Sequence, residues 1–474
     1  MIDLYAATCP VNPMQRCSEI GFAKVHQKST IMGSLPPRTI RETLAERSRP
    51  IAVHLSELIS RENQDIILDY RTLNPPPIFI YHPIYGKLLA GISDDLTHPP
   101  LEPQEFKNAA DFVGRARMYG SIESLQLQDI LYEELLSNCT TSIEDSSEFQ
   151  PSPLLIKVKS ADEETDPATY VERMYVDAYT SKEASGIRQA CCCPTLLVAC
   201  TGTYIQVLGA AFADHIIIQP LTGYISLLPH PGIRRGEPMG HAVLSRVALL
   251  FRALRAARAE LDTYYADIVS SLATTHPNPS LIAPFWTQFV HPEHGPVFLE
   301  YTGRIDADAY PSRAVFTARV VAIDMEPTEV VVKFAFQYGV EGHALLAPDF
   351  SPRLWHCAWE ESVGMWVIVM DHVRGSPLAE HEILTPTQGE KLRDAVGRLH
   401  AADLVFGDLR NVNVLTVGDD DIRLIDFDWC GKVGEARYPP DLYMGHDWPS
   451  GVHCGGLIEK AHDLQWVNEL TGVE

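Results

Sequence analysis

Two stretches near the end of this 474-residue chain set polar side chains into apolar runs. LVFGDLRNVNVL, residues 404–415, contains Asp408 and Asn413, and RLIDFDW, residues 423–429, contains Asp426. Burying a carboxylate or an amide without a partner is costly, so such groups are kept where they bind one another, a cation or a ligand. We therefore expect a fold that brings these three side chains together in one cleft.

The spacing of Asp408 and Asn413, D-x-x-x-x-N, is typical of the active-site loop of enzymes that transfer phosphoryl groups. In such a loop the aspartate orients the attacking hydroxyl, and the asparagine turns back towards a metal ion. Asp426 ends an apolar strand, where a carboxylate can coordinate a magnesium ion that bridges phosphates. The pattern predicts Asp408 as a catalytic residue, Asn413 and Asp426 as metal ligands, and ATP with Mg²⁺ as the cofactors.

A lysine lies in an apolar strand upstream of these stretches. Lys333 closes the run EVVVK, where its ammonium needs a carboxylate partner. Glu341, eight residues later at the start of the next predicted helix, is the predicted partner, and it would direct the lysine to the nucleotide phosphates. The strand MWVIVMDHV follows, and its end at Met370 and Asp371 is predicted to offer backbone groups to an adenine.

With these residues in this order, residues 297–474 resemble the protein kinase-like superfamily. On VFGDLRNVNVL, LIDFDWCGKVGEARYP and the late HDL, the segment resembles more closely the kinase-like proteins of mushroom-forming fungi. The resemblance implies an ATP- and Mg²⁺-dependent phosphotransferase that acts on a Ser/Thr-type hydroxyl of an unidentified acceptor. It implies that Lys333 contacts the phosphates, that Glu341 pairs with Lys333, and that Asp408 acts as the base.

The segment also departs from this family. Phe406 and Gly407 stand where the family's loop has His and Arg, and Gly303 is the one glycine where a Gly-rich phosphate loop is expected. The missing loop favours a pseudokinase that serves as a nucleotide-binding or interaction module. In the family's metal-binding triplet, which corresponds to Asp426, Phe427 and Asp428 in this sequence, Asp428 replaces a glycine. This replacement favours a small-molecule kinase of the aminoglycoside type. His400 is predicted to be a packed or capping residue.

The periodicity and the turn residues predict an α+β fold in three parts. Residues 1–150 are predicted to be a mostly helical region of unknown role, and residues 151–280 an α/β accessory domain that ends in a long amphipathic helix. Residues 297–474 are predicted to be a bilobal kinase-like domain with a shortened C-lobe. The predicted helices are 64–73, 121–139, 168–181, 241–269, 339–349 and 385–404. The predicted strands are 153–160, 194–212, 215–230, 297–305, 313–323, 328–336 and 365–373.

The composition excludes several partners. A formal net charge of −24 argues against binding to nucleic acid or to an anionic membrane. No apolar run is long enough to span a bilayer, and the chain opens without a secretory pattern, so a cytoplasmic location is expected. The ten cysteines show no CxxC pair and are predicted to be reduced thiols. Oligomeric state stays open.

Two further features of residues 151–280 have alternative interpretations. Arg246, Arg252, Arg255 and Arg258 recur along the predicted helix 241–269, and we interpret them as a solvated face rather than a nucleic-acid patch. The run LLIKVKS and the helix after it resemble the core of a restriction-type nuclease. A lysine, Lys157 in this sequence, stands where the acidic metal ligand is needed, which favours a degenerate binding scaffold over an active nuclease.

Overall fold

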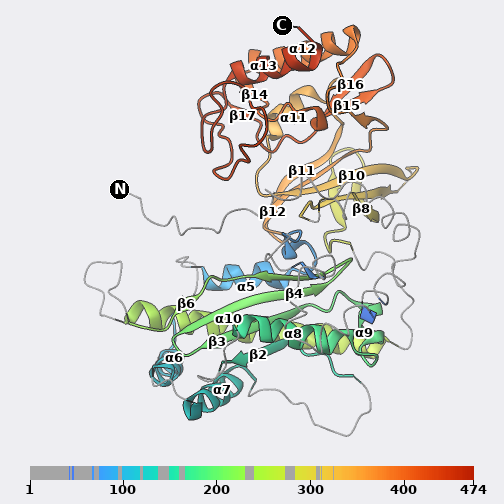
Figure 1. The fold of residues 1–474 in the computed structure, drawn as a ribbon. Coiled ribbons are helices and arrows are strands. Elements are labelled where there is room, and N and C mark those ends of the chain that lie inside the picture. The colour runs from blue at the N-terminus through green and yellow to red at the C-terminus, as the bar shows by residue number, and fades with distance from the viewer. Residues whose placement is uncertain are drawn as a thin grey trace. The chain divides into compact units, whose positions relative to one another are not determined.

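The computed structural model describes residues 42, 45–46, 67–68, 74–93, 99–117, 121–136, 149–159, 166–229, 240–272, 283–305, 310, 312–323 and 325–473. These residues form a mixture of helices and sheets, which confirms the predicted α+β class (Figure 1). The chain divides into two compact units, of which the second contains Trp286–Ile305 and the chain from Ala314 onwards. Among the described residues, no helix is both long and apolar enough to cross a bilayer.

The first unit is built on a mixed sheet with the strand order β1-β5-β4-β3-β2, and β6 pairs with β4. Its strands are β1 (Ile67–Leu68), β2 (Leu154–Val158), β3 (Thr195–Thr201), β4 (Tyr204–Phe212), β5 (Ile216–Pro220) and β6 (Ile225–Ser226). β2 runs parallel to β3, whereas β3, β4 and β5 are antiparallel neighbours. Nearly every residue of β3 and β4 is buried, so helices must cover both faces of the sheet.

The helices of the first unit are η3 (Ile78–Ile80), α5 (Ile84–Ile92), α6 (Pro103–Ala116), α7 (Ser121–Leu136), α8 (Pro167–Thr180), α9 (Ser185–Ala190) and α10 (His241–Ser271). On one face of the sheet, Val171 and Tyr175 of α8 pack with Leu197 of β3 in the core. On the other face, Tyr85 of α5 lies so close to Gly209 of β4 that a Cβ there would be 2.7 Å from the ring. Only glycine fits at that position.

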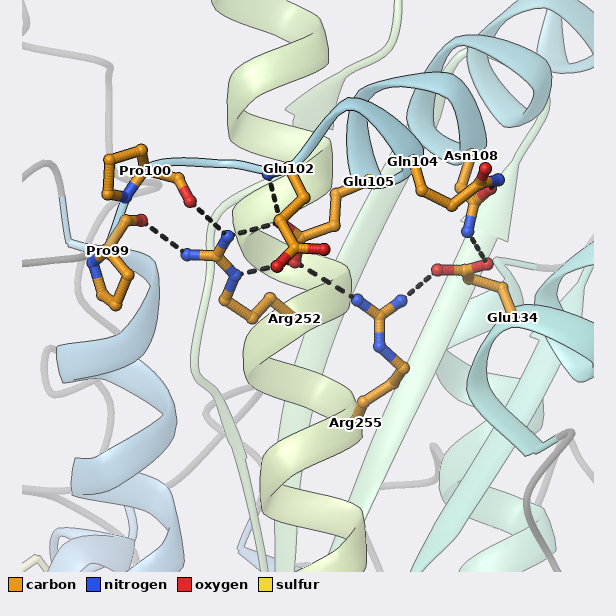
Figure 2. A network of polar contacts seen from close by, with 9 residues as sticks. All are labelled: Pro99, Pro100, Glu102, Gln104, Glu105, Asn108, Glu134, Arg252 and Arg255. Carbon is orange, nitrogen blue, oxygen red and sulfur yellow. Dashed lines mark hydrogen bonds and ion pairs between the residues drawn. The ribbon is translucent and has the colours of Figure 1, made fainter.

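Arg246 of α10 is exposed, as expected, but the other three arginines correct our interpretation of a solvated face. Arg252 forms a double contact with Glu105 of α6, and Arg255 bonds to Glu134 of α7 (Figure 2). Arg258 is buried and donates to the Leu135 carbonyl at 2.7 Å. The sequence could not show this, because the acidic partners come from helices more than a hundred residues away. These contacts attach α6 and α7 to α10, so residues predicted as a separate N-terminal region belong to the same unit.

The second unit begins with an antiparallel sheet in the order β11-β12-β10-β9-β8-β7. Its strands are β7 (Gln288–His291), β8 (Gly295–Arg304), β9 (Val315–Ala322), β10 (Thr328–Ala335), β11 (Leu354–Glu360) and β12 (Met365–Asp371). The predicted strands at 297–305, 313–323, 328–336 and 365–373 are confirmed. β7 and β11 were not predicted, and both form the sheet edges, where pairing with one neighbour decides the conformation.

The rest of the second unit contains helices and two small sheets (Figure 1). Its elements are α11 (Val340–Leu346), β13 (Ser376–Pro377), α12 (Pro386–Ala401), β14 (Leu404–Val405), η5 (Asn411–Asn413), β15 (Val414–Val417), β16 (Asp421–Leu424), β17 (Gly431–Lys432) and α13 (Lys460–Thr471). α12 starts as predicted, with Thr385 as its N-cap and Pro386 in its first turn, and Thr385 and Gln388 form a reciprocal capping box. α13 was not predicted.

The other predicted elements have mixed outcomes. The helices at 121–139 and 241–269 are confirmed as α7 and α10, although residues 137–139 lie outside the described residues. The helices at 168–181, 339–349 and 385–404 are also confirmed, and the strands predicted at 153–160, 194–212 and 215–230 are confirmed as β2, as β3 with β4, and as β5 with β6, although residues 160 and 230 lie outside the described residues. The helix at 64–73 is wrong where it can be compared, because Ile67 and Leu68 pair with β5 as a strand. Its other residues lie outside the described part of the chain.

Candidate functional site

A buried carboxylate anchors the loop that carries Asp408. Asp463 of α13 is fully buried, and its two oxygens accept the backbone N–H groups of Phe406 at 2.8 Å and Gly407 at 2.9 Å. His400 at the end of α12 donates from Nε2 to the same carboxylate at 3.0 Å. Three donors therefore hold one buried side chain, and the loop backbone cannot shift without leaving them unpaired.

The backbone of this loop requires glycine directly before Asp408. Gly407 has φ +85°, a left-handed conformation in which a side chain is strained, and a Cβ there would lie 2.8 Å from the Ile458 side chain. An arginine at this position cannot adopt the same conformation without displacing Ile458. The departure at Gly407 is therefore a consequence of local geometry.

Asp408 is buried and forms a bidentate ion pair with Arg410. The Arg410 Nε lies 2.5 Å from one Asp408 oxygen, and a terminal nitrogen lies 2.9 Å from the other. The guanidinium also lies over the ring of Trp448 at 5.3 Å from the ring centroid. Sequence reasoning missed Arg410, although an arginine two residues from a buried aspartate was the available signal. The pair balances the charge of Asp408 in its buried position.

Asn413 connects the loop to the strand end that carries Asp426. Its Nδ2 donates to the Asp408 carbonyl at 2.9 Å, and its own carbonyl accepts the Ile425 N–H at 3.0 Å. Because the amide nitrogen is used as a donor, Oδ1 is the side-chain atom that Asn413 has for a cation. Asp408, Asn413 and Asp426 are thus brought into one neighbourhood.

Lys333 reaches the same place from the sheet. Its Nζ lies 2.6 Å from an oxygen of Asp426 and 2.6 Å from an oxygen of Asp428. Lys333 and Asp426 are 93 residues apart in sequence, so only the tertiary fold brings them together. Asp428, which the sequence marked as a departure from the family pattern, is therefore part of the site.

The electrostatics of this cluster follow from burial and from unbalanced charge. Burial opposes the charge of Lys333, but the two aspartates outweigh it, and the pKa of Lys333 is raised. Burial also raises the pKa of Asp428 to about 7, with Lys333 opposing and the neighbouring Asp426 adding to the rise. Two carboxylates and one ammonium leave a net negative charge, so the cluster favours an additional cation or proton.

Glu341 does not pair with Lys333, which corrects that prediction. Its side chain is 69% exposed and lies 3.9 Å from Lys432. The reason is the orientation of α11, whose buried positions are Gly342, His343 and Leu346, so Glu341 at its start faces solvent. The carboxylates that Lys333 needs come instead from Asp426 and Asp428.

Met370 and Asp371 end β12, the predicted strand. Met370 is buried in the core of the second unit. The Asp371 N–H donates to the Arg353 carbonyl at 2.9 Å, and its carboxylate accepts the Trp355 indole N–H at 2.7 Å. The donor that we expected to face an adenine is therefore used within the sheet, and an adenine contact here stays a prediction.

Aromatic packing explains why a phenylalanine, Phe406, stands in the loop where the family has a histidine. Phe406 packs edge-on against Phe427 with ring centroids 5.1 Å apart, and Phe427 stacks on the His343 ring at 4.6 Å. Nδ1 of His343 accepts from the Tyr338 hydroxyl at 2.6 Å, while Nε2 donates to the Pro352 carbonyl at 2.8 Å. The ring is thus fully bonded as a neutral imidazole, and burial lowers the pKa of His343 to about 4.

His343 is expected to make the second unit sensitive to acid. Its folded pKa of about 4 lies below the ordinary value of 6.5, so the unfolded chain binds the proton first and stability falls as the pH drops from 6.5 to 4. The loss is expected to approach about 3 kcal/mol. Urea unfolding followed by tryptophan fluorescence measures it, because all seven tryptophans lie in the second unit.

The control for this prediction is His343→Gln, since a glutamine cannot titrate. The difference in unfolding free energy between the wild type and the variant should shrink as the pH falls through this window. An equal acid dependence in both proteins would show that His343 is not the responsible group.

A magnesium ion takes oxygen ligands, which the residues around Asp426 can supply. In the described part of the chain, no three His, Cys, Asp or Glu side chains gather into a metal-binding group. Asp426, Asp428 and Asn413 offer two carboxylates and one amide oxygen. Mg²⁺ is commonly held by one or two carboxylates together with phosphate oxygens and water, so these residues fit the ion when a nucleotide supplies further ligands.

The region that resembled a nuclease core has a contact between a lysine and an aromatic ring at its first strand. Lys157 of β2 lies over the Tyr170 ring of α8, with its Nζ 4.8 Å from the ring centroid. The lysine thus contacts an aromatic ring at the position where a nuclease needs an acidic ligand.

Comparison with protein-family models finds no match for this chain. A search of curated proteins finds no significant match either. The functional assignment therefore depends on the geometry of the site described above.

Proposed function

We propose that the second unit is a bilobal kinase-like domain that transfers a phosphoryl group from ATP, with Mg²⁺, to a hydroxyl group. The contact of Lys333 with Asp426 and Asp428 carries the proposal. It places a cation from an antiparallel sheet beside carboxylates that adjoin the Asp408 loop. In this proposal the six-stranded sheet with α11 is one lobe, and α12, α13 and the small sheets are a shortened second lobe.

Each group has a role that its surroundings support. Lys333 neutralises nucleotide phosphates, and Asp426, Asp428 and Asn413 hold magnesium, which supplies the charge that offsets the phosphates. The net negative charge of the Lys333 cluster supports this assignment, because a divalent cation removes the need for Asp428 to take a proton. Asp408 orients the acceptor hydroxyl and takes its proton.

A pseudokinase is the second candidate, and two observations favour it. Glu341 does not hold Lys333, and Arg410 occupies both oxygens of Asp408. An enzyme with this site has to accept the hydroxyl proton on the lone pairs that Arg410 leaves unused, or move Arg410 aside. A nucleotide-binding module has no such requirement.

A small-molecule kinase is the third candidate. It is favoured by Asp428 in the metal-binding triplet, and by the described chain after Asp426, in which α13 is the one α-helix. Such a lobe offers little helical surface for docking a folded protein substrate.

The test has two stages. ATP with Mg²⁺ is expected to raise the thermal stability of the full chain, since a ligand at 100 times its Kd stabilises the folded state by about 2.7 kcal/mol. Turnover of labelled ATP is then compared between the wild type and Asp408→Asn, with a peptide pool and a pool of small hydroxylated compounds as acceptors. Turnover should fall by about 100-fold or more in Asp408→Asn.

The matched control is Asp349→Asn, because Asp349 is 60% exposed and lies beside Arg398. It should leave turnover unchanged. Binding without turnover on either pool establishes the pseudokinase, and turnover confined to small compounds establishes the small-molecule kinase. Absence of any ATP-dependent stabilisation overturns the proposal.

A further inference from the structure

We propose that a groove beside the end of β12 binds an acidic peptide segment that carries one apolar side chain. Two cavities, of about 290 Å³ and about 620 Å³, adjoin there and share Arg353, Asp371 and His372. Neither cavity is lined by Lys333 or by the residues of the Asp408 loop. The groove shares Asp371 with the predicted adenine contact, but the inference is argued from the lining of the groove and does not depend on phosphotransfer.

The groove has more positive than negative side chains in its lining. Of the described residues that line it, four are arginines and two are carboxylates. They are Arg319, Arg353, Arg374, Arg423, Glu329 and Asp371. Glu300 and Asp421 beside the groove balance Arg319 and Arg423, so the charge that an anionic partner can meet comes from Arg353 and Arg374, which lie 3.3 Å and 3.4 Å from their own carboxylates.

Each of the four arginines has a carboxylate partner in its own chain. Arg319 pairs with Glu300 at 3.2 Å and Arg423 with Asp421 at 2.7 Å, so both have partners beside the groove. Arg374 is 87% exposed and lies 3.4 Å from Glu329.

Arg353 lies 3.3 Å from Asp371, whose same oxygen accepts the shorter bond from Trp355. Exposed pairs of this kind contribute little to stability, so an incoming carboxylate can replace them at low cost.

Arg353 is also preorganised for binding. Its guanidinium lies over the Trp355 ring at 4.6 Å, and the indole is itself fixed by its 2.7 Å bond to Asp371. A planar guanidinium held against a buried ring loses little freedom when it binds a carboxylate with both arms. Arg353 and Arg374 are thus the anchors that the geometry assigns to the acidic groups.

The smaller cavity adds an apolar component. Its walls include Pro348, Pro352, Val373 and Val417, which are rigid or branched side chains. This cavity accommodates an aliphatic side chain, while the wider cavity beside it presents the arginines. An apolar side chain flanked by acidic residues matches this order, whereas a small phosphorylated molecule would leave the apolar walls without a partner.

The proposal is tested with the full chain and a fluorescein-labelled peptide, Gly-Glu-Asp-Leu-Glu-Asp-Gly, by fluorescence polarisation. We expect saturable binding that weakens as salt is added. The double variant Arg353→Gln/Arg374→Gln should lose at least about tenfold in affinity, or about 1.4 kcal/mol. The control Arg398→Gln changes an arginine on α12 that is 43% exposed, and it should bind as the wild type does.

Three outcomes overturn the proposal. They are no binding up to about 1 mM peptide, equal binding by the double variant, and equal binding of a peptide with serine in place of leucine. Arginine-dependent binding of tripolyphosphate without binding of the peptide would assign the groove to phosphorylated small molecules instead. Lys333→Met should leave peptide binding intact, so failure of the proposed phosphotransfer cannot be confused with failure here.

Discussion

Replacement of Asp463 by alanine is expected to lower the free energy of unfolding of the second unit by about 3–5 kcal/mol. The carboxylate is fully buried and accepts from Phe406, Gly407 and His400. Its removal leaves two buried backbone N–H groups and one imidazole without an acceptor, and each unpaired donor costs about 1–3 kcal/mol. Urea unfolding followed by tryptophan fluorescence measures the change.

Two variants control this experiment. Asp463→Asn keeps one acceptor oxygen and should lose about half as much stability. Asp394→Ala removes an exposed carboxylate from α12 and should change the unfolding free energy by less than about 0.5 kcal/mol. If Asp463→Ala stays within about 1 kcal/mol of the wild type, the loop is not anchored by Asp463.

Lys333→Met is expected to affect activity as strongly as Asp408→Asn. Under the proposed function, ATP turnover should fall by about 100-fold or more, because the variant loses the cation that offsets developing phosphate charge. The same change leaves Asp426 and Asp428 facing each other without their shared ammonium. The stability lost should therefore be larger at pH 8 than at pH 6, since Asp428 takes a proton at the lower pH and relieves the repulsion.

The matched control is Lys432→Met. Lys432 is 59% exposed and lies 3.9 Å from Glu341, so its removal should leave turnover and stability close to those of the wild type. Turnover is measured with labelled ATP, and stability by urea unfolding at the two pH values. Unchanged turnover in Lys333→Met would contradict the proposed phosphate role, while unchanged stability would contradict the ion-pair geometry.

The apolar patterning of the chain was sufficient to predict most of the elements. Strands such as β8 and β10 have runs of β-branched and aromatic residues, and α10 and α12 show helical spacing with recognisable starts. The strand β11 was missed because LWHCAWE has no clear alternation and takes its conformation from pairing with β12. The helix α13 was missed, although its sequence, KAHDLQWVNELT, contains no residue that excludes a helix.

The site was predicted in part. The convergence of Asp408, Asn413 and Asp426 could be expected, since a short loop and one strand end connect them. The partner of Lys333 could not, because spacing in sequence favoured Glu341 while the orientation of α11 turned that residue to solvent. Arg410 was overlooked because an exposed role for arginine is the more common one.

The amino-acid pattern alone shows which side chains need partners: acidic, amide and lysine groups inside apolar runs, which cannot be buried alone. The packing of separate elements determines which groups these side chains pair with. The partners are all distant in sequence. Asp463 accepts from the loop backbone, Asp428 pairs with Lys333, and Glu105 and Glu134 pair with Arg252 and Arg255. Sequence spacing constrains neighbours along one element, whereas charge is neutralised by whichever group the packing of separate elements brings within a few ångströms.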